Sequence, residues 1–200
     1  MKLILASASP RRSEILEMLN MNFSIMNSDV DEEKIQTEML EKSPTNLVCT
    51  LSKAKAQAVA QQLEEGFVLG ADTVVVLDKQ IFGKPSNADE MRTMLKAFSS
   101  RAHQVLTGVT MTDAFSGKSA TSVAVTEVSF RAIEEFEIIW YEKNASYKDK
   151  AGGYAIQEHA ALFITGINGC YYNVVGLPVQ ETLNLFKQLG VNWKEFLVNG

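Results

Sequence analysis

The sequence predicts an α/β fold with a mixed β-sheet flanked by helices. Strand-like apolar runs and helix-like segments alternate along the whole chain, which is the order typical of this class. Two Ser-Pro pairs, at residues 9–10 and 43–44, are strong helix start signals. The 200 residues are 46% apolar and 22% charged. This is an ordinary globular composition and predicts a single domain over residues 1–200, with two lobes.

In the first third of the chain, apolar residues 2–6 predict a buried strand. A helix begins at Pro10, with Ser9 as its N-cap, and continues with apolar residues at helical spacing. Residues 23–28 are compatible with a strand, and residues 29–42 predict a charged loop or lid. The second Ser-Pro pair begins a longer helix with one apolar face, which we expect Gly66 to close.

The remainder of the chain continues the alternation. Residues 67–77 are apolar and β-branched, so they predict one or two strands that turn near Asp78. Asn87 with Glu90 resembles a capping box that begins a helix. The other expected elements are a long hairpin over residues 105–112 and 119–130, a helix over 134–143, a polar loop over 144–153, a short strand over 162–165, a loop over 166–177 and a last helix from Pro178 to Gly190.

Charge and targeting signals narrow the class of protein. The 19 basic and 24 acidic residues give a net charge of −5, which argues against a nucleic-acid polymer as the main partner. A small anionic ligand remains compatible with a local basic cluster. Without a signal-peptide pattern or an apolar run of about 20 residues, we expect a cytoplasmic protein and no membrane partner. Cys49 and Cys170 lack zinc-type spacing, and two buried free thiols are favoured over a disulfide.

The basic segment at residues 7–12 is the first candidate site. It contains Ser7, Arg11 and Arg12 where a strand passes into a helix. The N–H groups and dipole of a helix N-terminus attract anions, and arginine binds phosphate in a bidentate manner. Cations in a first turn oppose the dipole unless an anion is present, which favours a phosphate site. The alternative is a Ser-capped helix with two solvated arginines.

Acidic residues form the second candidate. Asp72 stands inside an otherwise apolar strand, where an unpaired carboxylate is costly, so a cation, a metal or a proton-transfer role is indicated. The alternative is a strand that ends at Gly70, with Asp72 capping a turn. The cluster at residues 30–33 reads either as a solvated charge run or as a partner of Asp72 in binding Mg²⁺.

Three further features are weaker when taken alone. Lys84 lies in a Gly-Lys-Pro turn, and Lys55 lies beside the apolar stripe of the second helix; each is compatible with a cleft or with plain surface. Residues 149–157, with two glycines, an aromatic and an amide, fit a loop against a flat ligand or a surface turn. His103 and His159 lack company for a catalytic triad, so both are interpreted as structural or surface residues.

Eight short segments in a fixed order resemble one family. They are residues 5–12, 30–32, 51–56, 70–75, 83–85, 107–109, 149–157 and 173–178. This ordered set is similar to the Maf family, the septum-site-associated nucleotide pyrophosphatases. The resemblance implies a long mixed sheet and two lobes around a central cleft, as in the inosine triphosphatase architecture. It also implies hydrolysis of a nucleoside triphosphate to the monophosphate and pyrophosphate with a divalent metal, Mg²⁺ or Mn²⁺, and a homodimer.

The resemblance assigns roles position by position. It implies that Asp72 is the general base and a metal ligand with Glu32, that Thr73 and Gln157 select the base, and that the phosphates are bound by Ser7, Arg11, Arg12, Lys55 and Lys84. Residues 149–157 are similar to the branch that acts on dTTP and UTP. The Gln157 amide can accept from N3–H and donate to O4 of uracil or thymine. After this glutamine the family has Gly-x-Gly, whereas this chain has Glu158-His159-Ala160.

Two other functions remain open at this stage. One is a nucleotide-binding regulator, for instance of cell division, that does not turn its ligand over. The other is a pyrophosphatase for inosine or xanthosine triphosphates. Asp72 favours an enzyme, because a protein that only binds gains nothing from a carboxylate positioned as a base beside phosphates.

Overall fold

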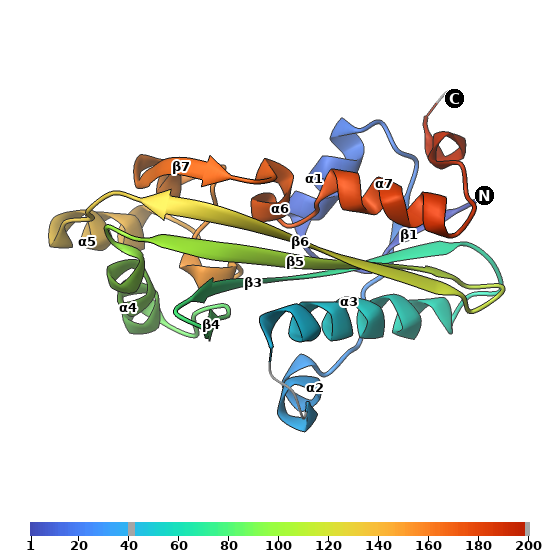
Figure 1. The fold of residues 1–200 in the computed structure, drawn as a ribbon, viewed down its shortest axis with the longest axis horizontal. Coiled ribbons are helices and arrows are strands. Elements are labelled where there is room, and N and C mark those ends of the chain that lie inside the picture. Colours follow the sequence, from blue (N-terminus) through green and yellow to red (C-terminus); the bar gives the residue numbers. More distant parts are fainter. Residues whose placement is uncertain (40–42, 199–200) are drawn as a thin grey trace. The chain divides into compact units, whose positions relative to one another are not determined.

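A computed structural model of the chain describes residues 1–39 and 43–198 (Figure 1). The strands are β1 (Leu3–Leu5), β2 (Ser24–Ile25), β3 (Phe67–Leu77), β4 (Gln80–Phe82), β5 (Ala102–Asp113), β6 (Ser119–Phe130) and β7 (Ile164–Asn168). The α-helices are α1 (Pro10–Met18), α2 (Glu32–Glu38), α3 (Pro44–Ala60), α4 (Ala88–Phe98), α5 (Glu135–Asn144), α6 (Tyr171–Val175) and α7 (Val179–Gln188). Within the described residues, no helix has the length and apolar character needed to cross a membrane.

The described strands form one mixed sheet, as the sequence predicts. Their order is β2-β1-β3-β5-β6-β7, and β4 pairs with β3. The pairs β1–β2 and β1–β3 are parallel, whereas β3–β4 and β6–β7 are antiparallel. The alternation of apolar strands and amphipathic helices therefore identified the fold class correctly.

The chain divides into two compact units. Unit 1 contains residues 1–72, 107–124 and 176–200, and unit 2 contains residues 73–106 and 125–175. Strands β3, β5 and β6 each contribute residues to both units. The expectation of a single domain with two lobes around a cleft stays a prediction.

Unit 1 is organised around the parallel strands β1, β2 and β3. Leu5 of β1 lies opposite Ile25 of β2 and Leu69 of β3. The chain passes from β1 through α1 to β2 on one side, and then through α3 to β3 on the other side of β1. Such a reversal of strand order is a topological switch point, and ligands bind beyond the carboxyl ends of the strands there. Ser7 follows β1 at this edge, and Asp72 lies beyond Leu69 on β3.

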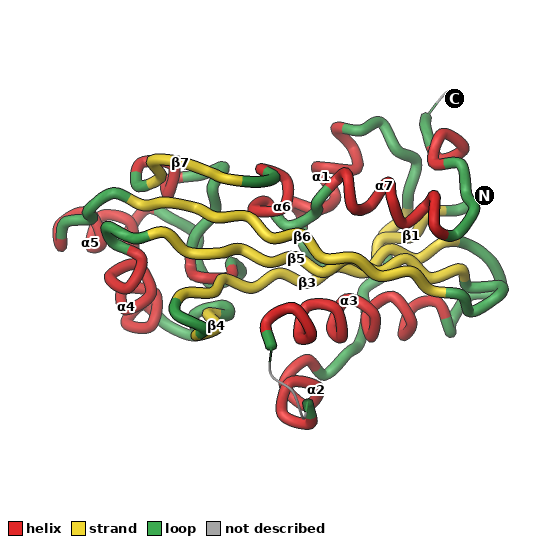
Figure 2. Tube along the Cα trace, viewed as in Figure 1, coloured by secondary structure: helices red, strands yellow, loops and turns green. Residues whose placement is uncertain are grey.

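Two glycines let α3 approach the strands of unit 1 closely. A Cβ atom at Gly70 of β3 would lie 2.3 Å from the carbonyl oxygen of Ser52, and one at Gly108 of β5 would lie 2.4 Å from that of Val48. Any larger residue would therefore push the helix away. Figure 2 shows α3 running along these strands, with α1 on their other side. The close approach matters for the site because α3 carries Lys55.

Each unit has its own apolar cluster. In unit 1 the clustered buried side chains come from β1 and the residue after it, from α3 and from β3: Ile4, Ala6, Ala56, Val59, Ala60 and Val68. The cluster of unit 2 is larger and rich in rings, and it includes Phe82, Phe98, Phe130, Tyr141, Tyr154 and Phe163. Phe98 stacks on His103, with ring centroids 4.5 Å apart. Apolar burial thus stabilises both units separately.

The structure corrects the expectation for residues 29–42. Instead of a loop, residues 32–38 form α2, whose N-cap Asp31 accepts a hydrogen bond from the backbone N–H of Lys34 at 2.9 Å. Glu32 and Glu33 in the first turn favour this helix through its dipole. None of the residues of α2 is buried. The helix therefore has no apolar stripe from which the sequence could predict it. Residues 40–42 of that expected loop lie outside the described residues.

Three smaller expectations are also corrected. Ser9 occupies the N-cap position of α1, but its side chain makes no capping hydrogen bond. The helix α3 ends at Ala60 rather than at Gly66, which has a φ of 121° and immediately precedes β3. Residues 166–177 are not a plain loop, because β7 extends to Asn168 and α6 follows.

Candidate functional site

Lys55 joins the two predicted acidic residues in unit 1. Its Nζ lies 2.7 Å from Oδ1 of Asp72 and 2.8 Å from Oε1 of Glu32. Lys55 and Asp72 are 8% and 7% exposed, whereas the Glu32 side chain is 45% exposed. The arrangement is thus a buried ion pair with a second, more accessible carboxylate at its outer edge.

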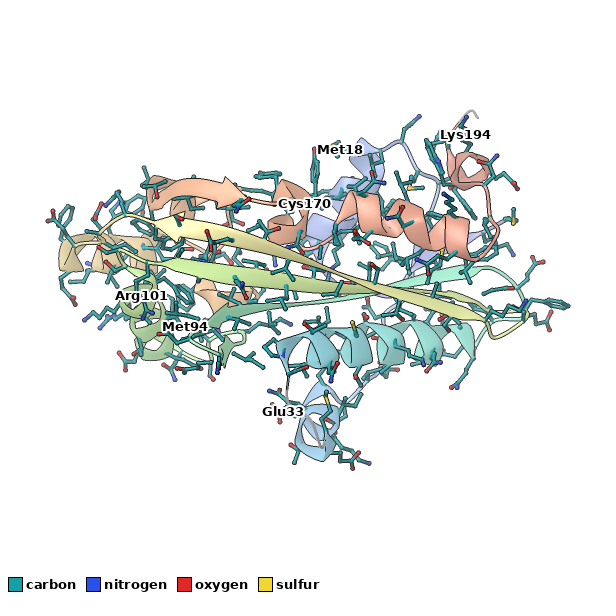
Figure 3. All side chains as sticks on the ribbon, in the orientation of Figure 1. Met18, Glu33, Met94, Arg101, Cys170 and Lys194 are labelled. Carbon is teal, nitrogen blue, oxygen red and sulfur yellow. The ribbon has the colours of Figure 1, made fainter. Side chains whose placement is uncertain are left out.

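Local packing explains why these three residues meet. Asp72 lies within β3, which continues to Leu77, so the alternative of a strand ending at Gly70 is wrong. The absence of a side chain at Gly70 lets α3 bring Lys55 to Asp72. The Asp31 cap begins α2 at Glu32, which places this carboxylate, rather than Glu33, on Lys55. Glu33 is exposed on the same helix, where Figure 3 labels it.

Ser7 and Arg12 form a second buried contact in unit 1. The Arg12 Nη1 donates to Oγ of Ser7 at 2.9 Å, and its Nε donates to the carbonyl oxygen of Gly176 at 2.8 Å. The Ser7 hydroxyl also accepts from the backbone N–H of Ser9 at 3.2 Å. Arg12 is 9% exposed, so the alternative of two solvated arginines is wrong for this residue. Arg11, beside it, is half-buried.

The charges of these residues act on one another. Burial raises the pKa of Asp72 above its ordinary value, while Lys55 and Arg12 oppose this rise by stabilising the carboxylate. The charge of Glu32 raises the pKa of Asp72 further. Burial lowers the pKa of Arg12, and the Asp72 charge opposes that change. A carboxylate with a raised pKa beside fixed cations is suited to accept a proton.

The other predicted residues belong to unit 2. Thr73 is half-buried in β3, and Lys84 and Gln157 are exposed. Their segments meet within the unit, because the backbone N–H of Gly152 donates to the carbonyl oxygen of Gly83 at 2.8 Å. Gly153 lies against Pro85, since a Cβ there would be 3.5 Å from Pro85 Cγ. The Gly-Lys-Pro turn and the loop that ends in Gln157 are therefore neighbours.

The histidines are placed as the sequence predicts, and the cysteines are free as expected but not fully buried. His103 is buried, with Nε2 2.7 Å from the hydroxyl of Tyr154, and burial lowers the pKa of His103 to about 4. His159 is exposed, and its ring lies 5.4 Å from that of Trp140. Cys49 and Cys170 are free, half-buried thiols. Figure 3 labels Cys170 close to α6.

Sequence reasoning missed two contributors. Gly176, which has a φ of 122°, accepts a hydrogen bond from Arg12 through its carbonyl oxygen. It lies in residues 173–178, one of the segments that carry the family resemblance. Lys150 is 3% exposed in unit 2, and its Nζ lies 2.9 Å from Oδ1 of Asp149 and 3.4 Å from Oε1 of Glu158. A lysine between a carboxylate and two glycines gave no sign of such burial.

The donor set bears on the metal that the resemblance implies. Asp72 and Glu32 place two carboxylate oxygens around a single cation, the Lys55 ammonium. Mg²⁺ and Mn²⁺ take hard oxygen ligands, and Mg²⁺ at a phosphate site commonly uses one or two carboxylates together with phosphate oxygens. Residues 1–39 and 43–198 contain no group of three or more His, Cys, Asp or Glu side chains that could hold a metal ion. Two carboxylates are fewer oxygen ligands than Mg²⁺ or Mn²⁺ takes, so phosphate oxygens would have to complete such a site.

Comparison with known proteins adds an independent observation. A relative from Syntrophus aciditrophicus strain SB, named dTTP/UTP pyrophosphatase, is 44% identical over 94% of this chain and 90% of its own length. Relatives with the same name from Desulforamulus reducens and Clostridioides difficile strain 630 are each 42% identical over 94% of this chain, and 97% and 95% of their own lengths are covered.

A solved structure of a nucleoside-triphosphatase, dITP/XTP pyrophosphatase, from Mycobacterium abscessus matches with a TM-score of 0.37. It is 11% identical and covers 66% of this chain and 76% of its own. The fold assignment above rests on the strand order of this chain and not on that likeness. The model of one family, described as Maf-like protein, matches residues 2–189. With this match over nearly the whole length and relatives above 40% identity, the chain belongs to the Maf family.

Proposed function

We propose that this protein is a nucleoside triphosphate pyrophosphatase that hydrolyses dTTP and UTP to the monophosphate and pyrophosphate. The observation that carries the proposal is the buried Asp72–Lys55 pair of unit 1, with Glu32 at its edge and the Ser7–Arg12 contact as its electrostatic neighbour. Relatives with more than 40% identity bear this activity as their name.

In the proposed reaction, water adds to the α-phosphorus and the bond from this phosphorus to the bridging oxygen breaks, so that pyrophosphate leaves. Asp72 accepts the proton of the attacking water. Its burial raises its pKa, which strengthens it as a base, while Lys55 fixes Oδ1 by a hydrogen bond of 2.7 Å.

The cations of unit 1 bind the triphosphate. Ser7 and Gly176 hold the Arg12 guanidinium in one orientation, so little conformational entropy is lost when it binds phosphate. Arg11 adds a second positive charge in the same helical turn. Asp72 and Glu32 would hold a Mg²⁺ or Mn²⁺ ion, which would supply neutralisation of phosphate charge and polarisation of bound water.

Unit 2 contributes base selection in this proposal. Gln157 is exposed at the end of its loop, so its amide is available to pair with N3–H and O4 of uracil or thymine. Cytosine presents the opposite donor and acceptor pattern. An unpaired buried polar group costs about 1–3 kcal/mol, so UTP should be preferred over CTP by roughly 10- to 100-fold.

The test is pyrophosphate release from a panel of nucleoside triphosphates with Mg²⁺ or Mn²⁺, repeated in excess EDTA. We expect hydrolysis of dTTP and UTP, slow hydrolysis of CTP and purine triphosphates, and loss of activity in EDTA. Gln157→Ala should flatten the ratio of UTP to CTP. Binding of nucleotides without turnover would instead favour the regulator, and preference for ITP or XTP would favour the purine enzyme.

A further inference from the structure

Lys150 is a buried ammonium in unit 2 to which the proposed reaction gives no role. Only 4% of its side chain is exposed, whereas its partners Asp149 and Glu158 have 49% and 38% of their side chains exposed. Burying a lysine is costly unless carboxylates compensate the charge. Its two carboxylate partners stand at the two ends of one loop, residues 149–158. The Lys150 ammonium therefore ties the two ends of this loop together.

The first part of the same loop is fixed by other contacts. The Tyr141 hydroxyl donates to the carbonyl oxygen of Gly153 at 3.2 Å. The backbone N–H of Gly152 donates to the carbonyl oxygen of Gly83 at 2.8 Å. Gly152 and Gly153 have φ values of 68° and 73°, a region that glycine adopts readily. Residues 152–156 are buried, whereas residues 157–159 are exposed.

The exposed end of the loop is held differently. The backbone N–H of Glu158 donates to the carbonyl oxygen of Ala155 at 3.2 Å, and the Glu158 carboxylate reaches Lys150 at 3.4 Å. Gln157 stands immediately before Glu158. Two contacts made by Glu158 thus fix the backbone of Gln157 from its carboxyl side, at the position where this chain departs from the Gly-x-Gly of its family.

We propose that Lys150 and Glu158 act as a pair of positioning residues for Gln157. Their ion pair closes the loop and fixes the backbone from which the Gln157 side chain projects, so that the discrimination between uracil and cytosine depends on Glu158. The inference rests on the proposed function, because it assigns to the pair a role in base selection. If the backbone at Gln157 were mobile, its amide could reach either base, whereas a fixed backbone restricts the positions that the amide can take.

The test is Glu158→Ala, assayed for pyrophosphate release on UTP and CTP. We expect KM for UTP to rise and the UTP-to-CTP ratio of kcat/KM to fall about 5- to 10-fold, with a smaller change in kcat, because positioning affects binding and selection more than bond breaking. Backbone amides of residues 155–159 should exchange with deuterium faster. Glu158→Asp, which keeps the charge, should restore part of the ratio.

A matched control separates positioning from simple loss of surface charge. Glu135→Ala removes another exposed carboxylate of unit 2, which pairs with Lys96 at 2.9 Å, and it should leave the ratio unchanged. The double variant Lys150→Met, Glu158→Ala should have the same UTP-to-CTP ratio of kcat/KM as Glu158→Ala alone, because the two residues act as one pair. If the parent protein prefers UTP and Glu158→Ala retains that preference, the positioning role is wrong. If the parent shows no preference for UTP, the proposed function itself fails, and the inference with it.

Discussion

The two units hold their buried ionisable groups in different ways. In unit 1, Asp72 and Lys55 are buried together, 2.7 Å apart, and Arg12 adds a second positive charge that acts on the carboxylate. In unit 2, His103 is buried among rings, against Phe98 and Phe130, with a tyrosine hydroxyl as its hydrogen-bond partner. Burial disfavours charge at both Asp72 and His103, but of the two only Asp72 has neighbours of opposite charge that act on its pKa.

The difference between Asp72 and His103 shows that a buried ionisable group can either exchange a proton or remain neutral and pack as part of the core. Burial raises the pKa of Asp72, and its cationic neighbours keep the ionised form accessible, so the group can exchange a proton. Burial lowers the pKa of His103 to about 4 with no compensating charge, so its ring is neutral near pH 7 and packs as an aromatic side chain. Substitution of Asp72 should therefore act mainly on turnover, and substitution of His103 mainly on stability.

The largest expected effect is that of Asp72→Asn. The amide keeps the shape and still accepts a hydrogen bond from Lys55, but it cannot take a proton. Pyrophosphate release should fall by about 10²–10⁴-fold, the usual range for a positioned general base, while the melting temperature stays level. Asp89→Asn is the matched control, since that side chain is 91% exposed. Near-parental turnover in Asp72→Asn would assign the proton transfer to another carboxylate, with Glu32 or Glu33 the nearest candidates.

Arg12→Ala should affect both activity and stability. From the sequence, a cation in the first turn of a helix predicts little loss of stability, but the structure reverses this expectation because Arg12 is buried on Ser7 and Gly176. We expect kcat/KM to fall by an amount that corresponds to about 2–4 kcal/mol of lost transition-state stabilisation. The melting temperature should fall as well. Arg12→Lys keeps the charge without the planar fork and should recover little activity. Unchanged kinetics with a lower melting temperature would make Arg12 purely structural.

The stability of unit 2 should depend on pH through His103. Its folded pKa of about 4 lies below the ordinary value of 6.5, so the unfolded chain binds the proton more readily. The free energy of unfolding is therefore fully maintained above pH 6.5 and falls as the pH drops toward 4, by up to about 3 kcal/mol. Urea unfolding between pH 8 and 4.5 measures this loss. His103→Phe should flatten the profile, and an equally steep fall in that variant would contradict the assignment.

The smallest effect concerns the packing that brings Lys55 to Asp72. Gly70→Ala would place a Cβ 2.3 Å from the Ser52 carbonyl oxygen, so α3 must move away from β3. We expect a loss of about 1–3 kcal/mol in unfolding free energy, the usual cost of overpacking, and reduced turnover. Gly166→Ala in β7 is the control, because a Cβ there meets no atom within 4 Å. Equal melting temperatures for the two variants would mean that α3 adapts without strain.

The sequence predicted the elements whose local signals agree with their packing. The Ser43-Pro44 start of α3 was found because Ser43 does cap the helix, accepting from the backbone N–H of Asn46 at 3.2 Å. The bounds of β3 were found because its residues are apolar on both faces and nearly all are buried. By contrast, α2 was missed because capping and the charges of its first turn, rather than an apolar stripe, define it.

The residues of the candidate site could be predicted from the sequence, but the contacts between them could not. Ser7, Arg12, Glu32, Lys55 and Asp72 were all named from the sequence, by chemistry and by resemblance. The role of Lys55 as a bridge between two carboxylates depends on the approach of α3 to Gly70, which is a long-range property of packing. The support of Arg12 by the Gly176 carbonyl depends on a backbone atom, for which residue type carries little information.

That last contact has a consequence for the synthesis of the protein. The Arg12–Gly176 hydrogen bond joins residues 164 positions apart. A ribosome that adds about 5–20 residues per second needs roughly 8–30 seconds to cover this distance. Throughout that interval Arg12 has been added to the chain, while the carbonyl that orients it has yet to be made. The Ser7–Arg12 contact region of unit 1 is consequently among the last parts of the nascent chain to be completed, after the strands beside it.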